Sequence, residues 1–161
     1  YKINAPITII FSAMLKDDEF AETYNNTIAF NKKALRNREI SNRNLQKDMF
    51  LSANDVKGIA AHEMGHIISR KYGEKGLDIA AETYYNIHKK KPSKDDLLNH
   101  LKKTVSVYSG EYKRSPTGED VPVHKRKYIE ITPEVIAKDM YGEKTEFSAE
   151  YIKNLKGRCG L

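Results

Sequence analysis

Residues 52–73 read SANDVKGIAAHEMGHIISRKYG and form the clearest structural pattern in the chain. Apolar residues recur in it at helical spacing until Gly73 ends the run. Ser52 and Asp55 form a capping signature just before the first apolar position. The stretch therefore predicts an amphipathic, capped α-helix.

This expected helix carries the pattern H-E-x-x-H as His62-Glu63-Met64-Gly65-His66. Histidines four positions apart lie about 40° apart around a helix and about 6 Å apart along it, so both imidazoles can bind one ion. Zinc suits two neutral imidazoles, and a catalytic zinc keeps a position for water whose proton Glu63 is placed to accept. Gly65, inside the helix, predicts a close approach by another backbone. The alternative interpretation is a pair of surface histidines on an ordinary helix.

A third protein ligand has to come from elsewhere in the chain. The extended pattern H-E-x-x-H-x-x-G-x-x-H is excluded, because Ser69 and Tyr72 occupy its glycine and last histidine positions. The remote candidates are Glu82, Glu143, Glu146, Glu150, His88, His100 and His124. Glu82 and Glu146 both lie on expected helices beside small or apolar neighbours, where a cation would offset the cost of burying a carboxylate.

The remaining pattern predicts an α+β domain. Short strands are expected at Ile7–Phe11 and Thr27–Phe30, and an exposed loop at Arg36–Asp48. Further helices are expected at residues 77–90 and after the Ser93/Asp96 capping pair. Another is expected to start with Thr132 as its N-cap and Pro133 as its first helical position. A last helix is expected from Thr145 to Lys156, with Gly157 closing it. Residues 112–127 hold Pro and Gly among charges and predict a loop with a short extended piece.

Composition narrows the class of protein. The 161 residues, 39% hydrophobic and 31% charged, fit one globular domain over residues 1–161. The single Cys159 excludes a disulfide framework and a cysteine-rich zinc site, and the longest uncharged run, Ile3–Leu15, is too short for a membrane span. We interpret the chain, which starts at Tyr1 without a secretory signal, as a piece of a longer protein in an unassigned compartment.

Two motifs together resemble a known family. The H-E-x-x-H pattern and the later run TEFSAEY, residues 145–151, resemble the gluzincin group of zincin-fold zinc peptidases. They look most like the catalytic domain of anthrax lethal factor and related metallopeptidase domains of phage head-morphogenesis proteins and toxins. The resemblance implies a zincin-like fold with a small mixed sheet, an active-site helix and a late helix with the third ligand.

The resemblance also implies residue roles. Glu146 would be the third zinc ligand beside His62 and His66, with Glu150 supporting the site and Tyr141 donating to the oxyanion. Tyr128 and Tyr151 are alternatives for the tyrosine, because Tyr141 is closer to Glu146 than is usual in the family, and Glu82 is the alternative ligand. In this fold an edge strand above the active helix pairs with an extended substrate. Thr27–Phe30 is a candidate for that edge strand, or else a buried or hairpin strand without such a role.

The favoured hypothesis is a zinc-dependent endopeptidase with a protein or peptide substrate. Glu63 would be the general base and Tyr141 the second catalytic residue. One alternative is a catalytically silent metal-binding module of a phage particle or toxin. The other is a basic nucleic-acid-binding domain: the net charge of +6 permits an acidic partner, but the lysine runs lack interleaved aromatics. A phage particle, a secreted toxin and the host cytoplasm are all compatible locations, and the sequence does not indicate an oligomeric state.

Overall fold

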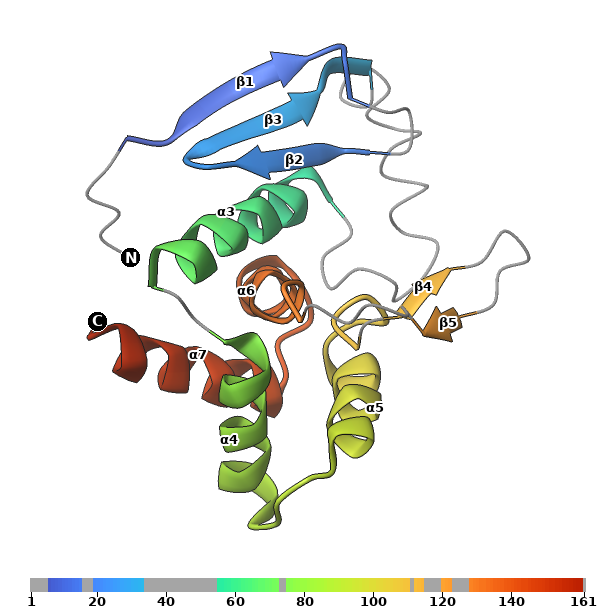
Figure 1. Cartoon of the computed structure of the whole chain (residues 1–161), viewed down its shortest axis with the longest axis vertical. Coiled ribbons are helices and arrows are strands. Elements are labelled where there is room, and N and C mark those ends of the chain that lie inside the picture. Colours follow the sequence, from blue (N-terminus) through green and yellow to red (C-terminus); the bar gives the residue numbers. More distant parts are fainter. Residues whose placement is uncertain are drawn as a thin grey trace.

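The computed structural model describes residues 6–15, 19–33, 55–72, 75–110, 112–114, 120–122 and 128–160. Its element order is α+β: strands come first, helices follow, and a short hairpin interrupts the helices. Figure 1 shows the sheet on one side of the molecule, helix α3 beneath it, and the other helices beyond α3.

The described strands at the N-terminal side form a small mixed sheet in the order β1-β3-β2. β1 (Thr8–Ser12) runs parallel to β3 (Thr27–Asn31), and β2 (Ala21–Tyr24) runs antiparallel to β3. β3 is thus the central strand and a hairpin partner of β2, so it is not the open edge that Thr27–Phe30 was a candidate for. Among the described strands, that edge next to α3 belongs to β2.

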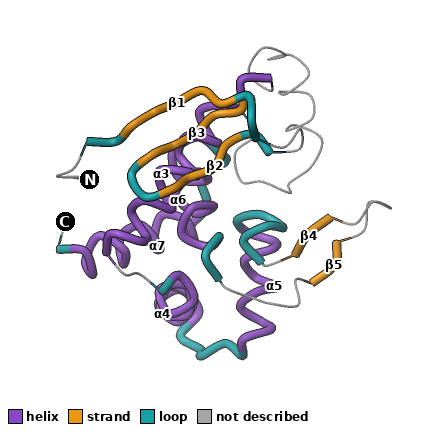
Figure 2. Tube along the Cα trace, turned by 45° about the horizontal axis from the view of Figure 1, so that its top comes forward, coloured by secondary structure: helices purple, strands orange, loops and turns teal. Residues whose placement is uncertain are grey.

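The described part of the chain also contains five helices longer than ten residues. They are α3 (Val56–Tyr72), α4 (Gly76–His88), α5 (Lys94–Thr104), α6 (Ile131–Tyr141) and α7 (Glu146–Cys159). The sheet covers one side of α3, and α6 packs against the other side, where it crosses α3 (Figures 1 and 2). α3 therefore lies between two layers, which explains why apolar residues occur on more than one of its faces.

Local signals explain where several helices start. Asp55 accepts a hydrogen bond from the backbone N–H of Gly58 at 2.6 Å, while Ser52 lies outside the described residues. Ser93 caps α5 by accepting from the backbone N–H of Asp96 at 3.2 Å, as its spacing predicted. Thr145 and Ser148 form a reciprocal capping box at the start of α7.

Two helix boundaries differ from the expectation. α6 begins at Ile131 with Glu130 as the N-cap residue, so Thr132 is already inside the helix. α7 continues through Gly157 and ends at Cys159, and Gly160, with a φ of 66°, provides the left-handed C-cap. Gly157 does not close the helix, because a glycine ends a helix only where the backbone turns left-handed.

The expected loop at residues 112–127 contains a short hairpin. β4 (Tyr112–Arg114) pairs antiparallel with β5 (Asp120–Pro122). The loop expected at Arg36–Asp48 lies outside the described residues. None of the described helices combines the length and the apolar character that a membrane crossing requires.

The two larger apolar clusters of the described residues hold the layers together. The larger joins the helices below α3 around fully buried side chains such as Ile79, Leu101 and Leu155. The smaller joins the sheet to the upper side of α3 through Ile28, Phe30, Ile59 and Ile67. Each cluster fixes one face of α3, so the helix that carries the H-E-x-x-H pattern is held from both sides.

Candidate metal site

His62 and His66 point from α3 toward the chain that enters α6. In the described part of the chain, His62, His66 and Glu130 form a group whose donor atoms all lie within 4.8 Å of one another. Glu130 Oε2 is 3.2 Å from His62 Nε2 and 3.3 Å from His66 Nε2. The two histidines thus converge, as their helical spacing predicted, and a carboxylate from far along the chain joins them.

These separations fit a tetrahedral metal site. Donor atoms at about 2.0–2.1 Å from a tetrahedral zinc ion are about 3.3 Å apart, close to the two histidine–carboxylate distances. Glu130 Oε2 is buried, and its contacts among the described residues are the two imidazole nitrogens. A divalent cation between these three atoms would take the place of the proton that now links them.

The packing of α6 against α3 explains how Glu130 reaches the histidines. Gly65 lies between His62 and His66, and a Cβ placed on it would be 2.5 Å from the Cα of Pro133. Only a residue without a side chain permits this approach, which confirms the close backbone contact that Gly65 predicted. Glu130 precedes Pro133 by three positions and makes no side-chain capping bond with its own helix, so its carboxylate can face α3.

A second carboxylate supports the first histidine. Glu134 lies one turn beyond Glu130 in α6, is 1% exposed, and places Oε1 2.6 Å from His62 Nδ1. A carboxylate on the outer nitrogen of a metal-binding histidine fixes the orientation of the ring and increases its basicity. The arrangement leaves His62 Nε2 facing Glu130.

The charges are strongly coupled in the protein without a metal. Burial alone would lower the pKa of His62, but Glu130 and Glu134 outweigh it and raise that pKa to about 10. Burial alone would raise the pKa of Glu130, but His62 and His66 outweigh it and lower that pKa to about 2. A proton on His62 therefore occupies the place that a cation would take.

Glu63, the expected general base, lies on the side of α3 that faces the sheet. It is 7% exposed, and the hydroxyl of Thr23 in β2 donates a short hydrogen bond to its Oε2. The same hydroxyl also lies 3.3 Å from the Glu63 backbone carbonyl oxygen. Edge strand β2 thus holds the carboxylate in one orientation.

Tyr108 is a neighbour of the site that the motifs did not indicate. It lies in the turns after α5, and its ring stacks near His62 at a centroid distance of 6.2 Å and an interplanar angle of 30°. Its aromatic side chain therefore flanks the group of donor atoms.

Other expected site residues lie in different surroundings. Glu146 is exposed in the first turn of α7, and Tyr141 is 48% exposed at the end of α6. Glu82 pairs with Arg158 at 2.6 Å, and Glu150 pairs with Lys153 at 3.2 Å. None of these residues belongs to the His62/His66/Glu130 group.

The other candidate tyrosines and histidines of the described part of the chain make contacts elsewhere in the fold. Tyr151 is fully buried, with its hydroxyl 2.6 Å from Thr132 Oγ1, and Tyr128 packs beneath the Lys94 ammonium. His88 and His100 belong to an aromatic cluster with Tyr84 and Phe147. His124 lies outside the described residues.

The sequence carries only a partial signal for Glu130. Glu130 and Glu134 are four positions apart, like His62 and His66, and Glu134 is surrounded by the apolar residues of α6. This spacing marks a pair of acidic residues, but it does not show that they pack against α3. No protein-family profile, curated protein or solved structure matches the chain, so its functional assignment rests on this geometry.

Proposed function

We propose that this domain is a zinc-dependent metallopeptidase in which His62, His66 and Glu130 bind the metal. The observation that carries the proposal is the pair of contacts from Glu130 Oε2 to the two histidine Nε2 atoms, 3.2 and 3.3 Å long. Two histidines and one carboxylate are a ligand set typical of catalytic zinc, which keeps its fourth position for water. The H-E-x-x-H pattern on α3 adds the acidic residue that hydrolytic chemistry needs.

Glu130 is a better third ligand than Glu146 on geometric grounds. The partly buried Glu130 carboxylate lies against both histidines, whereas Glu146 is exposed at the start of another helix. Glu146 as ligand and Tyr141 as oxyanion donor remain hypotheses from the resemblance to gluzincins. Among the described residues, the tyrosine whose ring lies beside His62 is Tyr108.

Each side chain then has a defined task in peptide hydrolysis. Zinc, when bound, supplies a Lewis acid that polarises the substrate carbonyl and lowers the pKa of water. Glu63 accepts a proton from the attacking water and passes it to the leaving amine nitrogen, while Thr23 keeps its carboxylate oriented. Glu134 holds the His62 ring in place.

The sheet offers a place for an extended substrate. β2 is an open edge among the described strands and lies beside α3, where Thr23 contacts Glu63. A peptide added antiparallel or parallel to β2 would gain backbone hydrogen bonds and would run past the general base. This arrangement favours a polypeptide substrate over a compact small molecule.

Metal analysis and cleavage assays test the proposal together. Purified protein should contain about one zinc ion per chain, and a chelator should abolish cleavage of an unfolded-protein or peptide-library substrate. Glu63→Gln should retain zinc and lose activity by several orders of magnitude, whereas His66→Ala should lose both. Normal turnover by a folded Glu63→Gln protein would refute the mechanism. Bound zinc without cleavage of any substrate would instead indicate the silent metal-binding module.

A further inference from the structure

Arg70 lies where the open edge of β2 meets the last turn of α3. Its Nε donates to the His66 backbone carbonyl at 3.3 Å, and its two terminal nitrogens donate to the backbone carbonyls of Thr23 and Asn25, each at 3.4 Å. Arg70 is nevertheless exposed. It therefore links the helix that carries the H-E-x-x-H pattern to the strand proposed to bind substrate, and it remains accessible to a ligand.

The hydrogen-bonding pattern of the sheet shows that Arg70 covers one end of this edge. The Phe20 carbonyl accepts from the backbone N–H of Asn31 at 2.9 Å, so the backbone groups of Phe20 point toward β3. Backbone groups alternate along an antiparallel strand, so those of Ala21 and Thr23 point toward the open edge. An added strand can thus pair with β2 from Ala21 as far as Thr23, where it meets the guanidinium of Arg70.

The positive charge of Arg70 is not neutralised within the described part of the chain. Its hydrogen-bond acceptors are three neutral carbonyls, and no described carboxylate forms an ion pair with it. Glu22, the acidic residue of β2, alternates with Thr23, whose side chain faces α3, so the Glu22 side chain lies on the other face of the sheet. A guanidinium has five N–H groups, and the three hydrogen bonds leave one on each terminal nitrogen.

This arrangement is suited to a carboxylate ligand. Arginine binds a carboxylate through two N–H groups of one planar cation, and the carbonyls that hold Arg70 orient that plane before a ligand arrives. Arg70 follows His66 by about one helical turn, about 6 Å along α3, which corresponds to about two residues of an extended chain. A carboxylate at Arg70 would therefore belong to a substrate residue about two positions from the metal.

We propose that Arg70 is a specificity-determining residue that binds a carboxylate of the peptide substrate at the end of the β2 edge. The proposal rests on the function proposed above, in which a peptide pairs with β2 beside the metal site. The carboxylate is either the C-terminus of the substrate, which then runs parallel to β2 and ends at Arg70, or the side chain of an acidic residue. In both cases the substrate class is a peptide with a negative charge about two residues from the cleaved bond.

Peptide binding to the full chain with added zinc tests the proposal and separates the two sources of the carboxylate. The chain carries Glu63→Gln, so that peptides are not cleaved during the measurement. Four mixtures of fluorescein-labelled hexapeptides, otherwise built from uncharged residues, carry a free C-terminal carboxylate, a C-terminal amide, an amide with one internal Glu, or an amide with Gln in its place. In at least one pair, the mixture with the carboxylate should bind about three- to tenfold more tightly by fluorescence anisotropy.

The pair that shows the preference identifies the source. A preference in the first pair assigns Arg70 to the C-terminus of the substrate, and a preference in the second pair assigns it to an acidic side chain. Equal affinity within both pairs, or no saturable binding of any mixture, would overturn the proposal.

Substitutions of Arg70 separate recognition of a carboxylate from support of the hairpin. Arg70→Gln should reduce the preference for the carboxylate to less than about twofold. Arg70→Lys keeps the charge but loses the planar pair of N–H groups, so it should retain part of the preference. The preference is a ratio of affinities within one variant, so a general loosening of β2 would weaken both affinities and leave the ratio unchanged. An unchanged ratio in Arg70→Gln would therefore refute recognition by Arg70.

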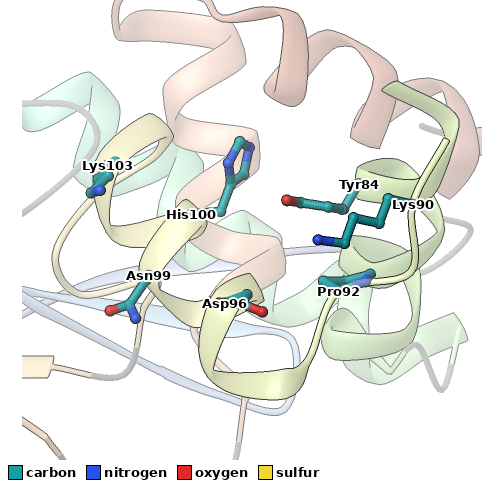
Figure 3. A pocket seen from close by; sticks show the side chains of 7 residues that line it. All are labelled: Tyr84, Lys90, Pro92, Asp96, Asn99, His100 and Lys103. Atoms are coloured by element: carbon teal, nitrogen blue, oxygen red, sulfur yellow. The ribbon is translucent and has the colours of Figure 1, made fainter. Parts of the chain in front are cut away.

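Two lysines provide controls for net charge. Lys71 follows Arg70 in the last turn of α3, and its ammonium lies 5.4 Å from the centroid of the Tyr72 ring. Lys103 lines a separate pocket between α4 and α5 (Figure 3), beyond α3 from the sheet (Figure 1). Lys71→Gln and Lys103→Gln should each change the preference by less than about twofold. Equal losses in these variants and in Arg70→Gln would show that only net charge matters.

Cleavage of the same mixtures by the unaltered chain distinguishes failure of this proposal from failure of the peptidase assignment. Binding with a preference that depends on Arg70, but without cleavage, would support the carboxylate subsite and contradict the peptidase assignment. Cleavage without such a preference would support the peptidase assignment and would show that Arg70 only links α3 to β2.

Discussion

Replacing Glu130 by glutamine should separate the two candidates for the third zinc ligand. The change keeps the shape of the side chain but removes the charge that faces both histidine Nε2 atoms. Zinc sites bind with about 10–16 kcal/mol, so one of four ligands accounts for about 2.5–4 kcal/mol. At 1.4 kcal/mol for each factor of ten, Glu130→Gln should weaken zinc binding about 100- to 1000-fold.

Glu146→Gln is the matched control for this experiment. Glu146 is exposed in the first turn of α7, so its loss should cost the helix about 0.3–1 kcal/mol and leave zinc affinity within about twofold. Competition with a chromophoric chelator measures both affinities, and circular dichroism verifies that each variant is folded. A large loss of affinity in Glu146→Gln with none in Glu130→Gln would refute the assignment of Glu130 and restore Glu146.

Three further outcomes follow from the contacts of α3. Thr23→Val should lower kcat about tenfold at unchanged zinc content, because it removes the hydroxyl that orients Glu63, and Thr23→Ser should restore activity; equal activity of both variants would contradict that role. Gly65→Ala should destabilise the fold by about 1–3 kcal/mol and lower the melting temperature by about 3–10 °C, because the added Cβ meets the backbone of Pro133. Gly157→Ala has open space around the added Cβ and should raise stability slightly. Equal effects of the two changes on the melting temperature would count against the close approach at Gly65. The pKa of His62 is raised from 6.5 to about 10, so the stabilisation of chelator-treated protein by protonated His62 is complete below pH 6.5 and is lost as the pH rises toward 10. A melting temperature that does not fall across this pH range would contradict the coupling of His62 to the two carboxylates.

The first half of the site could be predicted from the sequence because it depends on local geometry. One helix carries both histidines, and the helical repeat alone fixes their relative positions. Gly65 predicted a close backbone contact in the same way, since a glycine inside a helix needs a structural reason. The caps at Ser93 and Thr145 were predictable because each cap involves residues only three positions apart.

The second half depends on packing between distant segments, which a single sequence does not specify. The sequence predicts Thr132 as the N-cap of this helix, whereas the structure has Glu130 in that position, so the predicted helix does not include Glu130 or its neighbours. β2 was missed because Ala21–Tyr24 is short and carries a charge, and its strand conformation depends on pairing with β3. Without β2, neither the partner of Glu63 nor the true edge of the sheet could be inferred.

The spacing of the three donors along the chain has a consequence for the lifetime of the folded protein. His66 and Glu130 are separated by more than sixty residues, which include all of α4 and α5. A bound cation would therefore link two segments that are far apart in the sequence. Local opening of α6 would require the cation to be released. The free energy of opening should accordingly increase by RT ln(1 + [Zn]/Kd) as the free zinc concentration rises, and proteolytic digestion should become slower. Metal supply would then regulate turnover of the protein as well as its chemistry.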